Sequence, residues 1–212
     1  MRDNPKRRRP NERPKGKDAY RSRKEFPPGP DEAPAEGAIV GRNAVTEALR
    51  AGRVLDKVYI QKGDTEPALG RIAAQAREAG AVVVQADRRK LDALSGHMAH
   101  QGVVAVEAAA EYVTVEDILN VARERGEAPL VVVCDEISDP HNLGAIIRSA
   151  ECAGAHGVII PKRRSAGVTA VVSKTSAGAS AHIAIARVAN IAQALRELKE
   201  AGVWTYAAEA EG

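Results

Sequence analysis

The sequence predicts an α/β protein in which a small α/β/α domain precedes a second, parallel α/β domain. Two observations carry this prediction. From residue 38 onward, short apolar runs typical of strands alternate with amphipathic stretches that end at glycine. The first 37 residues, by contrast, are rich in Arg, Lys, Pro and Gly and nearly free of aliphatic side chains. Such a segment buries too little surface to offset its ordering entropy, so we expect residues 1–37 to form a disordered basic tail.

Residues 38–108 are predicted to form the small α/β/α domain. Helices are expected at 43–52, 68–80 and 88–95, and strands at 55–60, 81–86 and 102–108. In the first helix Val45, Ala48 and Leu49 fall on one face, and Gly52 ends it. About 70 residues in this order suffice for an independent domain.

Residues 109–128 are predicted to connect the domains and to contain a helix bounded by Thr114 and Gly126. Residues 129–212 then predict a parallel, doubly wound sheet, because strand and helix patterns alternate strictly. We expect Trp204 in its core. The expected strands are 130–137, 157–161, 182–188 and 203–209, and the expected helices are 143–154, 169–179 and 190–202.

The net charge of +3 conceals an asymmetry between the tail and the body. Residues 1–24 contain eleven Lys and Arg against three Asp and Glu, a balance of +8, which leaves −5 for the other 188 residues. A basic tail on a mildly acidic body predicts attraction to a polyanion, most simply RNA, although a merely solubilising tail has the same composition. Aromatic residues make up only 3% of the chain, which disfavours modules that stack RNA bases on exposed Phe and Tyr.

Composition also argues against several other classes of protein. Hydrophobic residues make up 44% of the chain, which excludes a wholly disordered protein, and no apolar run is long enough to span a membrane. The first 30 residues lack the apolar stretch of a secretory signal. The two cysteines, Cys134 and Cys152, have no metal-ligand spacing and no nearby His, so we expect buried thiols, no metal and no disulfide. We therefore expect a cytoplasmic protein.

The segment from Asp135 to Ala150 carries most of the chemical information. It places a polar turn between a buried strand and a helix, where backbone N–H groups are free. We expect Asn142 at or near the helix cap, Gly144 at a close approach to the backbone, and Arg148 on the same face as Gly144. Asn142 and Arg148 would then converge at the carboxyl edge of the sheet. A cap, a packing contact and a surface ion pair explain the same three residues equally well.

Residues 135–169, DEISDPHNLGAIIRSAECAGAHGVIIPKRRSAGVT, closely resemble motif 1 of the SpoU (TrmH) branch of the SPOUT RNA methyltransferases. The resemblance continues to Gly212. Upstream, IVGRNAVTEALRAGRVLDKVYI and HMAHQGVVAVEA are similar to the beginning and end of that branch's N-terminal RNA-binding domain. The resemblance thus covers about residues 38–212, and it is strongest to the enzymes that methylate a guanosine ribose in 23S ribosomal RNA.

This resemblance implies a fold, a reaction and roles for two residues. Residues 38–108 would be a substrate RNA-binding domain similar to a small ribosomal protein, and residues 129–212 would be the N-terminal part of a trefoil-knot SPOUT domain. The enzymes of this family are homodimers that use S-adenosyl-L-methionine. By position, Asn142 and Arg148 are the catalytic pair of motif 1. Because a guanidinium has a pKa above about 12, we expect Arg148 to stabilise a developing alkoxide rather than to act as a base.

One departure from the family concerns the cofactor. Motif 2, a turn rich in Gly and Glu, and motif 3, an Asn-Val-Ser-like helix start, normally follow a strand like that at 203–209, and neither occurs before Gly212. Those motifs build the knot and most of the cofactor pocket. We therefore expect the cofactor-binding residues beyond Gly212, and an incomplete SPOUT domain that does not bind cofactor normally in the 212-residue chain.

Candidate RNA contacts occur in both domains, and each has a structural alternative. Arg42 and Asn43, beside Gly41, could contact a phosphate or a base, or could be a helix start with a solvated Arg. His100 and Gln101 precede a strand and resemble the family's pattern, although such a pair is more often structural. The basic turn formed by Lys162, Arg163 and Arg164 fits an RNA contact and a solvated loop equally well.

The sequence therefore predicts that the full-length protein transfers a methyl group from S-adenosyl-L-methionine to a ribose 2′-hydroxyl in 23S ribosomal RNA. Two alternatives stay open. One is a transfer-RNA ribose methyltransferase. The other is a non-catalytic RNA-binding protein, whose RNA affinity would fall with salt and which would transfer no methyl group.

Overall fold

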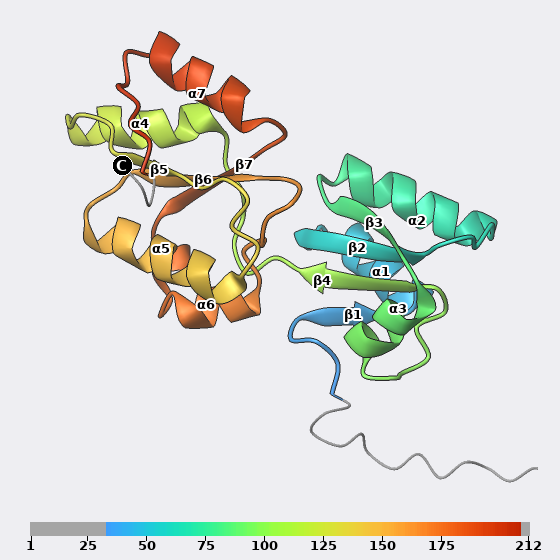
Figure 1. Cartoon of the computed structure of the whole chain (residues 1–212). Coiled ribbons are helices and arrows are strands. Elements are labelled where there is room, and N and C mark those ends of the chain that lie inside the picture. Colours follow the sequence, from blue (N-terminus) through green and yellow to red (C-terminus); the bar gives the residue numbers. More distant parts are fainter. Residues whose placement is uncertain (1–32, 209–212) are drawn as a thin grey trace, which may run out of the picture.

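The computed structural model describes residues 33–208, which form two α/β units joined by a short connection (Figure 1). Most of the predicted basic tail, residues 1–32, lies outside the described residues, as do residues 209–212. The end of that predicted tail is already part of the first domain, because the Ala35 amide donates a hydrogen bond of 2.9 Å to the Leu94 carbonyl.

The first domain is a four-stranded mixed sheet with helices on both faces, as predicted (Figure 1). Its strand order is β1-β4-β2-β3, in which β2 and β3 are parallel and the other pairs are antiparallel. Helices α1 and α2 pack on one face and α3 packs on the other. The elements are β1 (Ala38–Val40), α1 (Arg42–Arg50), β2 (Leu55–Gln61), α2 (Pro67–Glu78), β3 (Val82–Ala86), α3 (Arg88–Ser95) and β4 (Val103–Glu107).

The second domain is a parallel three-stranded sheet, β5-β6-β7, with helices on both faces. Helices α5 and α6 cover one face, and α4 and α7 cover the other, so the predicted doubly wound arrangement is confirmed (Figure 1). The elements are α4 (Val115–Arg125), β5 (Val131–Val133), α5 (Pro140–Cys152), β6 (Gly157–Pro161), α6 (Ala170–Thr175), the 3₁₀ turn η2 (Ala179–Ala181), β7 (Ala184–Val188) and α7 (Ile191–Glu200).

Helix α4 was predicted in the segment that connects the domains, but it packs on the sheet of the second domain. Its bounds are those that its sequence predicts. Thr114 accepts a hydrogen bond from the Asp117 amide, and the Asp117 carboxylate accepts one from the Thr114 amide, which makes a capping box. The Asp117 carboxylate also accepts a hydrogen bond from the Thr114 hydroxyl at 2.6 Å, and this bond, followed by the one from the Thr114 amide, lowers the pKa of Asp117. Gly126 ends the helix in the left-handed conformation, with φ of 67°.

The strand predicted at 203–209 was wrong for the part that the structure describes. Residues 203–208 form no strand. Trp204, which was expected in the core, is 83% exposed, and Tyr206 is 89% exposed. An apolar run becomes a strand only where a neighbouring strand pairs with its backbone, and residues 203–208 pair with none of the strands within 33–208. Strand β5 is also shorter than the predicted 130–137, because the chain leaves the sheet after Val133.

The two cysteines differ in their exposure to solvent, although both were predicted to be buried. Cys134 follows β5 and is buried, and burial raises the pKa of its thiol to about 11. Cys152 is exposed. The buried stripe of α5 is Leu143, Ile147 and Ala150, and a residue two positions after Ala150 is turned by about 200° to the opposite side of the helix. Within residues 33–208, no helix is long and apolar enough to cross a membrane, and no three His, Cys, Asp or Glu side chains gather to hold a metal ion.

Candidate functional site

The carboxyl ends of β5 and β6 place two polar loops side by side. Residues 134–139 follow β5, and residues 162–165 follow β6. The loops are tied together at Ile137, whose carbonyl accepts hydrogen bonds from the Ala166 amide at 2.8 Å and from Ser165 Oγ at 3.1 Å. Parallel sheets bind ligands at this edge, so it is the first place to look for a site.

Helix α5 begins at this edge, and its cap is not the residue that the sequence suggested. Asp139 accepts a hydrogen bond of 2.9 Å from the His141 amide, and Pro140 occupies the first helical position. Asn142 lies in the first turn and is exposed. Because Asp139 supplies the cap, the Asn142 side chain is not needed to hold the helix start.

Arg148 is also exposed on α5, and it forms no ion pair within residues 33–208. The structure does not bring it into contact with Asn142. Arg148 comes six positions after Asn142 in the helix. The two residues are therefore about 9 Å apart along the helix axis and about 120° apart around it. The prediction that the two side chains converge at the sheet edge was therefore wrong, and only a substrate that spans this separation could touch both.

Gly144 allows α5 and α6 to pack closely. A Cβ atom on Gly144 would overlap the Thr175 side chain, at 2.9 Å from its Cβ, and would lie 3.0 Å from the Ser176 amide nitrogen. The group that approaches Gly144 is therefore Thr175 and not a ligand, in agreement with the structural alternative.

Three of the candidate RNA contacts meet at the start of α1. Gly41 has no side chain to cap this helix, and Gln101 replaces it: its Oε1 accepts a hydrogen bond of 3.2 Å from the Arg42 amide. The Arg42 guanidinium pairs with Glu66 at the start of α2. Asn43 is exposed. Gln101 therefore has a structural role in capping α1, whereas Asn43 faces solvent.

His100 is a buried structural residue. The Gly102 amide donates to His100 Nδ1 at 3.0 Å, and His100 Nε2 lies 3.1 Å from Asp92 Oδ1. Since Nδ1 accepts, the proton of the neutral ring is on Nε2 and is donated to Asp92. Both contacts hold the turn before β4, so His100 does not present a free group to RNA.

Lys162, Arg163 and Arg164 lie apart from the α1 group. Strand β4 runs from the far end of the first domain toward the second domain, so its preceding turn is remote from the boundary between the domains (Figure 1). The basic turn after β6 is instead at that boundary. All three side chains are exposed, and Arg164 pairs with Glu136 at 3.0 Å. The two groups of candidate residues are thus separate, and only the turn after β6 presents several cations to solvent.

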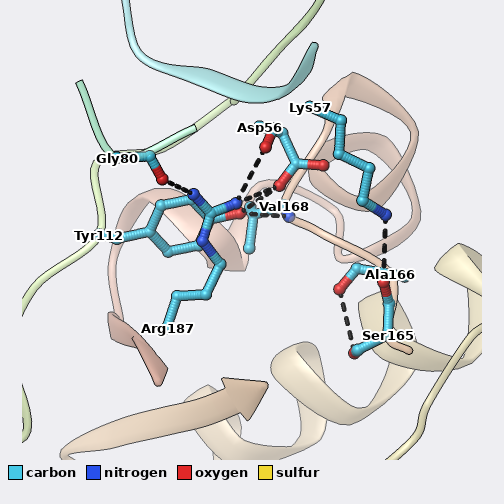
Figure 2. Close-up of polar contacts among 8 residues, drawn as sticks. All are labelled: Asp56, Lys57, Gly80, Tyr112, Ser165, Ala166, Val168 and Arg187. Carbon is cyan, nitrogen blue, oxygen red and sulfur yellow. Dashed lines mark hydrogen bonds and ion pairs between the residues drawn. The ribbon is translucent and has the colours of Figure 1, made fainter. Parts of the chain in front are cut away.

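A buried polar cluster at the domain boundary was not predicted from the sequence. Arg187 Nη1 on β7 donates to Asp56 Oδ1 on β2 at 2.6 Å, and Nη2 donates to the Gly80 carbonyl at 2.9 Å (Figure 2). The Tyr112 hydroxyl donates to Asp56 Oδ1 at 3.1 Å and accepts from the Val168 amide at 2.9 Å. The Arg187 guanidinium also stacks 4.1 Å from the Tyr112 ring centroid. Each of these interactions links the two domains directly or links one domain to the segment that connects them.

This cluster is well shielded from water. The Asp56 and Arg187 side chains are 2% and 6% exposed. Burial, and then the Asp56 charge, raise the pKa of Tyr112. A bulge in β2 between Leu55 and Lys57 turns Asp56 out of the ladder toward the second domain. One signal was visible in the sequence, since Arg187 is the single charged residue of the otherwise apolar strand β7, whereas Asp56 shares β2 with Lys57.

One hollow, lined in part by residues 202–206 near the end of the described chain, does not suit S-adenosyl-L-methionine. The hollow beside β5, of about 510 Å³, is lined mainly by apolar side chains, including Leu130, Leu195 and Leu198. Its aromatic side chains, Trp204 and Tyr206, are largely exposed. Within residues 33–208, no buried charged group faces this hollow to hold the amino and carboxylate groups of such a cofactor.

Two family profiles match the chain in the order of its domains. Residues 38–113 match the profile described as RNA 2′-O ribose methyltransferase substrate binding. Residues 129–212 match the SpoU rRNA Methylase family. The gap between the two matches contains α4.

Similar proteins come from several bacteria. YacO of Bacillus subtilis, named as a TrmH family tRNA/rRNA methyltransferase, is 41% identical over 81% of this chain and 69% of YacO. A protein of Staphylococcus haemolyticus with the same family name is 41% identical, over 82% of this chain and 69% of that protein. A Synechocystis protein named as an uncharacterized tRNA/rRNA methyltransferase is 38% identical, over 86% of this chain and 50% of that protein.

Two solved structures also match. The AdoMet-bound rRNA methyltransferase of Sinorhizobium meliloti is 23% identical, with 75% of this chain and 57% of that chain covered and a TM-score of 0.32. The SpoU methyltransferase AviRb of Streptomyces viridochromogenes is 19% identical, with 78% and 58% covered and a TM-score of 0.34. This chain thus spans less than two thirds of either solved chain. Since both TM-scores are below 0.5, family membership rests on the sequence matches. With 41% identity across 69% of YacO and both domains matched in order, this chain belongs to the SpoU (TrmH) family of RNA methyltransferases.

Proposed function

We propose that the full-length protein transfers a methyl group from S-adenosyl-L-methionine to a ribose 2′-hydroxyl of a guanosine in 23S ribosomal RNA. We further propose that it acts in the cytoplasm as a homodimer and that residues outside 33–208 bind the cofactor. One observation carries the proposal: a substrate-binding match and a methylase match occur in order on two separately folded domains. The names of the relatives, tRNA/rRNA methyltransferases, support RNA as the substrate.

In this proposal α5 carries the groups that act on the ribose. The Arg148 guanidinium would donate hydrogen bonds to the 2′-oxygen and stabilise its negative charge as the proton leaves. Asn142, about 9 Å closer to the sheet edge along the helix axis, would orient the neighbouring phosphate or ribose. The exposure of both side chains, and the supply of the helix cap by Asp139, support this assignment.

Two other functions are each favoured by an observation. The names of the relatives mention transfer RNA as well as ribosomal RNA. These names therefore support a transfer-RNA substrate as much as a ribosomal-RNA substrate. The substrate-binding match of the first domain also fits a protein that binds RNA without methylating it.

Nucleoside analysis of the product separates these functions. The full-length protein is incubated with tritiated S-adenosyl-L-methionine and either unmodified 23S ribosomal RNA or unmodified transfer RNA, and the RNA is then digested to nucleosides. The proposal predicts label in 2′-O-methylguanosine from 23S ribosomal RNA. Label only in transfer RNA would establish the first alternative. RNA binding without label in either RNA would establish the second, and label on a base would contradict ribose chemistry.

A further inference from the structure

A groove of about 750 Å³ lies between the two domains, beside the carboxyl ends of β5 and β6. One wall is the sheet of the first domain, and the other is formed by the loops that follow β5 and β6. The groove thus adjoins the edge where α5 begins. Its lining includes Tyr59 and Val84 of the first domain and Glu136, Lys162, Arg163 and Arg164 of the second.

The floor of this interdomain groove is an uncovered part of a sheet face. Helix α3 packs against β1, β4 and β2, and it reaches β3 at Ala86 but leaves Val82 and Val84 uncovered at the sheet edge. Val82 and Val84 on β3 are therefore only half-buried, and Tyr59 on β2 lies between them and α3. The result is an apolar floor that no other element within residues 33–208 covers.

The rim of the groove is basic. Lys57, Lys162, Arg163 and Arg164 provide four cations against the single carboxylate of Glu136. Lys162 and Arg163 form no ion pair within the described part of the chain. Lys57 Nζ donates to the Ser165 carbonyl at 3.2 Å, which leaves two of its three N–H groups for a ligand.

The pairing of Arg164 with Glu136 leaves the Arg164 cation accessible as well. The two side chains are 83% and 61% exposed. An ion pair at such exposure is weak because water screens the two charges, so a phosphate can replace the carboxylate readily.

The buried polar cluster fixes the distance between the two walls. Asp56 precedes Lys57 on β2, and its partner Arg187 lies on β7, which pairs with β6 just before the basic turn (Figure 2). The Lys162 amide donates to the Val188 carbonyl at 2.7 Å, so the start of that turn is held to the end of β7. The groove is therefore a preorganised feature of the docked domains.

We propose that this interdomain groove binds a single-stranded segment of RNA, with its phosphates on the basic rim and one nucleotide against the apolar floor. The proposal rests on the RNA substrate proposed above and names where that RNA lies as it approaches α5. A volume of this size suits one or two nucleotides rather than a duplex. In a duplex the stacked bases could not reach an apolar floor, whereas unpaired bases can. Tyr59 supplies the aromatic contact that the low aromatic content made unexpected.

A binding experiment tests the basic rim. Fluorescence anisotropy of a labelled 12-nucleotide single-stranded RNA is measured with the full chain and with the double variant Lys162→Ala/Arg163→Ala. The matched control, Arg196→Ala/Lys199→Ala, removes the same charge from the exposed face of α7. The groove variant should raise Kd about tenfold. It should also reduce the magnitude of the slope of log K, the association constant, against log salt concentration by about 1.4, as expected when two phosphate contacts are lost.

The control variant should change Kd by less than about twofold, since it removes charge away from the RNA. Equal weakening by both double variants would overturn the proposal, because the attraction would then follow net charge alone. The basic tail is present in every variant, so its contribution cancels in the ratio.

A cross-linking experiment tests the floor independently. The same RNA carrying 5-iodouridine is irradiated with the protein, and the attached peptide is identified by mass spectrometry. The proposal predicts attachment at Tyr59, which is lost in Tyr59→Leu. Trp204 and Tyr206 are far more exposed, so attachment only at these residues or in the tail would overturn it. Neither experiment needs methyl transfer. A negative methylation assay can therefore be distinguished from a failure of the groove to bind RNA.

Discussion

Arg148 is the residue on which the proposed chemistry depends most. Its guanidinium is exposed on α5 and forms no ion pair within residues 33–208, so the charge is available to a substrate. We predict that Arg148→Ala lowers the single-turnover rate of methyl transfer about 100-fold or more, the usual loss for a group that stabilises a developing oxyanion. Arg196→Ala on α7 is the control and should leave the rate unchanged.

The affinity for S-adenosyl-L-methionine, measured by equilibrium dialysis with the full-length protein, should stay the same in Arg148→Ala. A parallel fall in rate and cofactor affinity would show that Arg148 binds the cofactor instead of stabilising the ribose oxygen.

The two thiols should differ in reactivity. Because the thiolate is the reactive form and burial raises the pKa of Cys134 to about 11, iodoacetamide at pH 8 should alkylate Cys152 and spare Cys134. The rate at Cys134 should rise with pH toward that value. Peptide mass spectrometry of native and urea-unfolded protein measures both sites. Equal labelling of the two cysteines in the native protein would contradict the burial of Cys134.

The sequence located some residues of the candidate site correctly and missed or misassigned others. Motif 1 located Asn142 and Arg148 on the exposed side of one helix, and their roles remain predictions. Gln101 and His100 instead have local structural roles, which a pattern of residue types does not distinguish from RNA contacts. Asp56 and Arg187 are 131 positions apart, and no local pattern reveals that two charged residues so distant in sequence pair with one another.

At the scale of the element, local periodicity predicted most helices and strands because each buries a single face. Helix α2 is an example: its buried residues Leu69, Ile72, Ala73 and Ala76 follow the helical repeat. Strand β1 was missed because three residues are too few to show an alternation. The run at 203–209 has a strand-like composition, but composition does not supply the neighbouring strand that pairing requires.

Two helix glycines, Gly144 in α5 and Gly70 in α2, should respond in opposite ways to an added methyl group. Gly144→Ala should destabilise the protein by about 1–3 kcal/mol, because the added methyl group overlaps Thr175. Gly70→Ala should stabilise it by about 0.5–1 kcal/mol, because Gly70 lies within α2 and an added methyl group meets nothing within 4 Å. Urea unfolding measures both free energies. A stabilising Gly144→Ala would refute the close approach of the two helices.

At the scale of the whole molecule, the Asp56–Arg187 pair should couple the stability of the two domains. Removing either partner leaves a buried charge without its counterion, so Asp56→Ala and Arg187→Ala should each cost about 3–5 kcal/mol of unfolding free energy. The double variant should lose less than the sum of the two. The exposed Arg164–Glu136 pair is the control, and its coupling should not exceed about 1 kcal/mol. Similar coupling energies for the two pairs would argue against a fixed domain boundary.

The domain arrangement sets where an RNA could lie. Exposed groups occur at the start of α1, remote from the second domain, and again at the interdomain groove beside α5. An RNA that contacts both must run along the first domain toward the carboxyl edge of the second sheet. This path follows from the docking of the domains, and sequence patterns that describe each domain separately could not predict it.

The most direct test of the proposed function is a map of ribose methylation in cells that lack the gene. A 2′-O-methyl group prevents the 2′-oxygen from attacking the adjacent phosphodiester, so a methylated position resists alkaline hydrolysis. Sequencing of alkali-treated 23S ribosomal RNA should show one guanosine that loses this resistance when the gene is deleted. Resistance should return with the wild-type gene and not with Arg148→Ala. An unchanged 23S pattern in the deletion strain would contradict the proposed function.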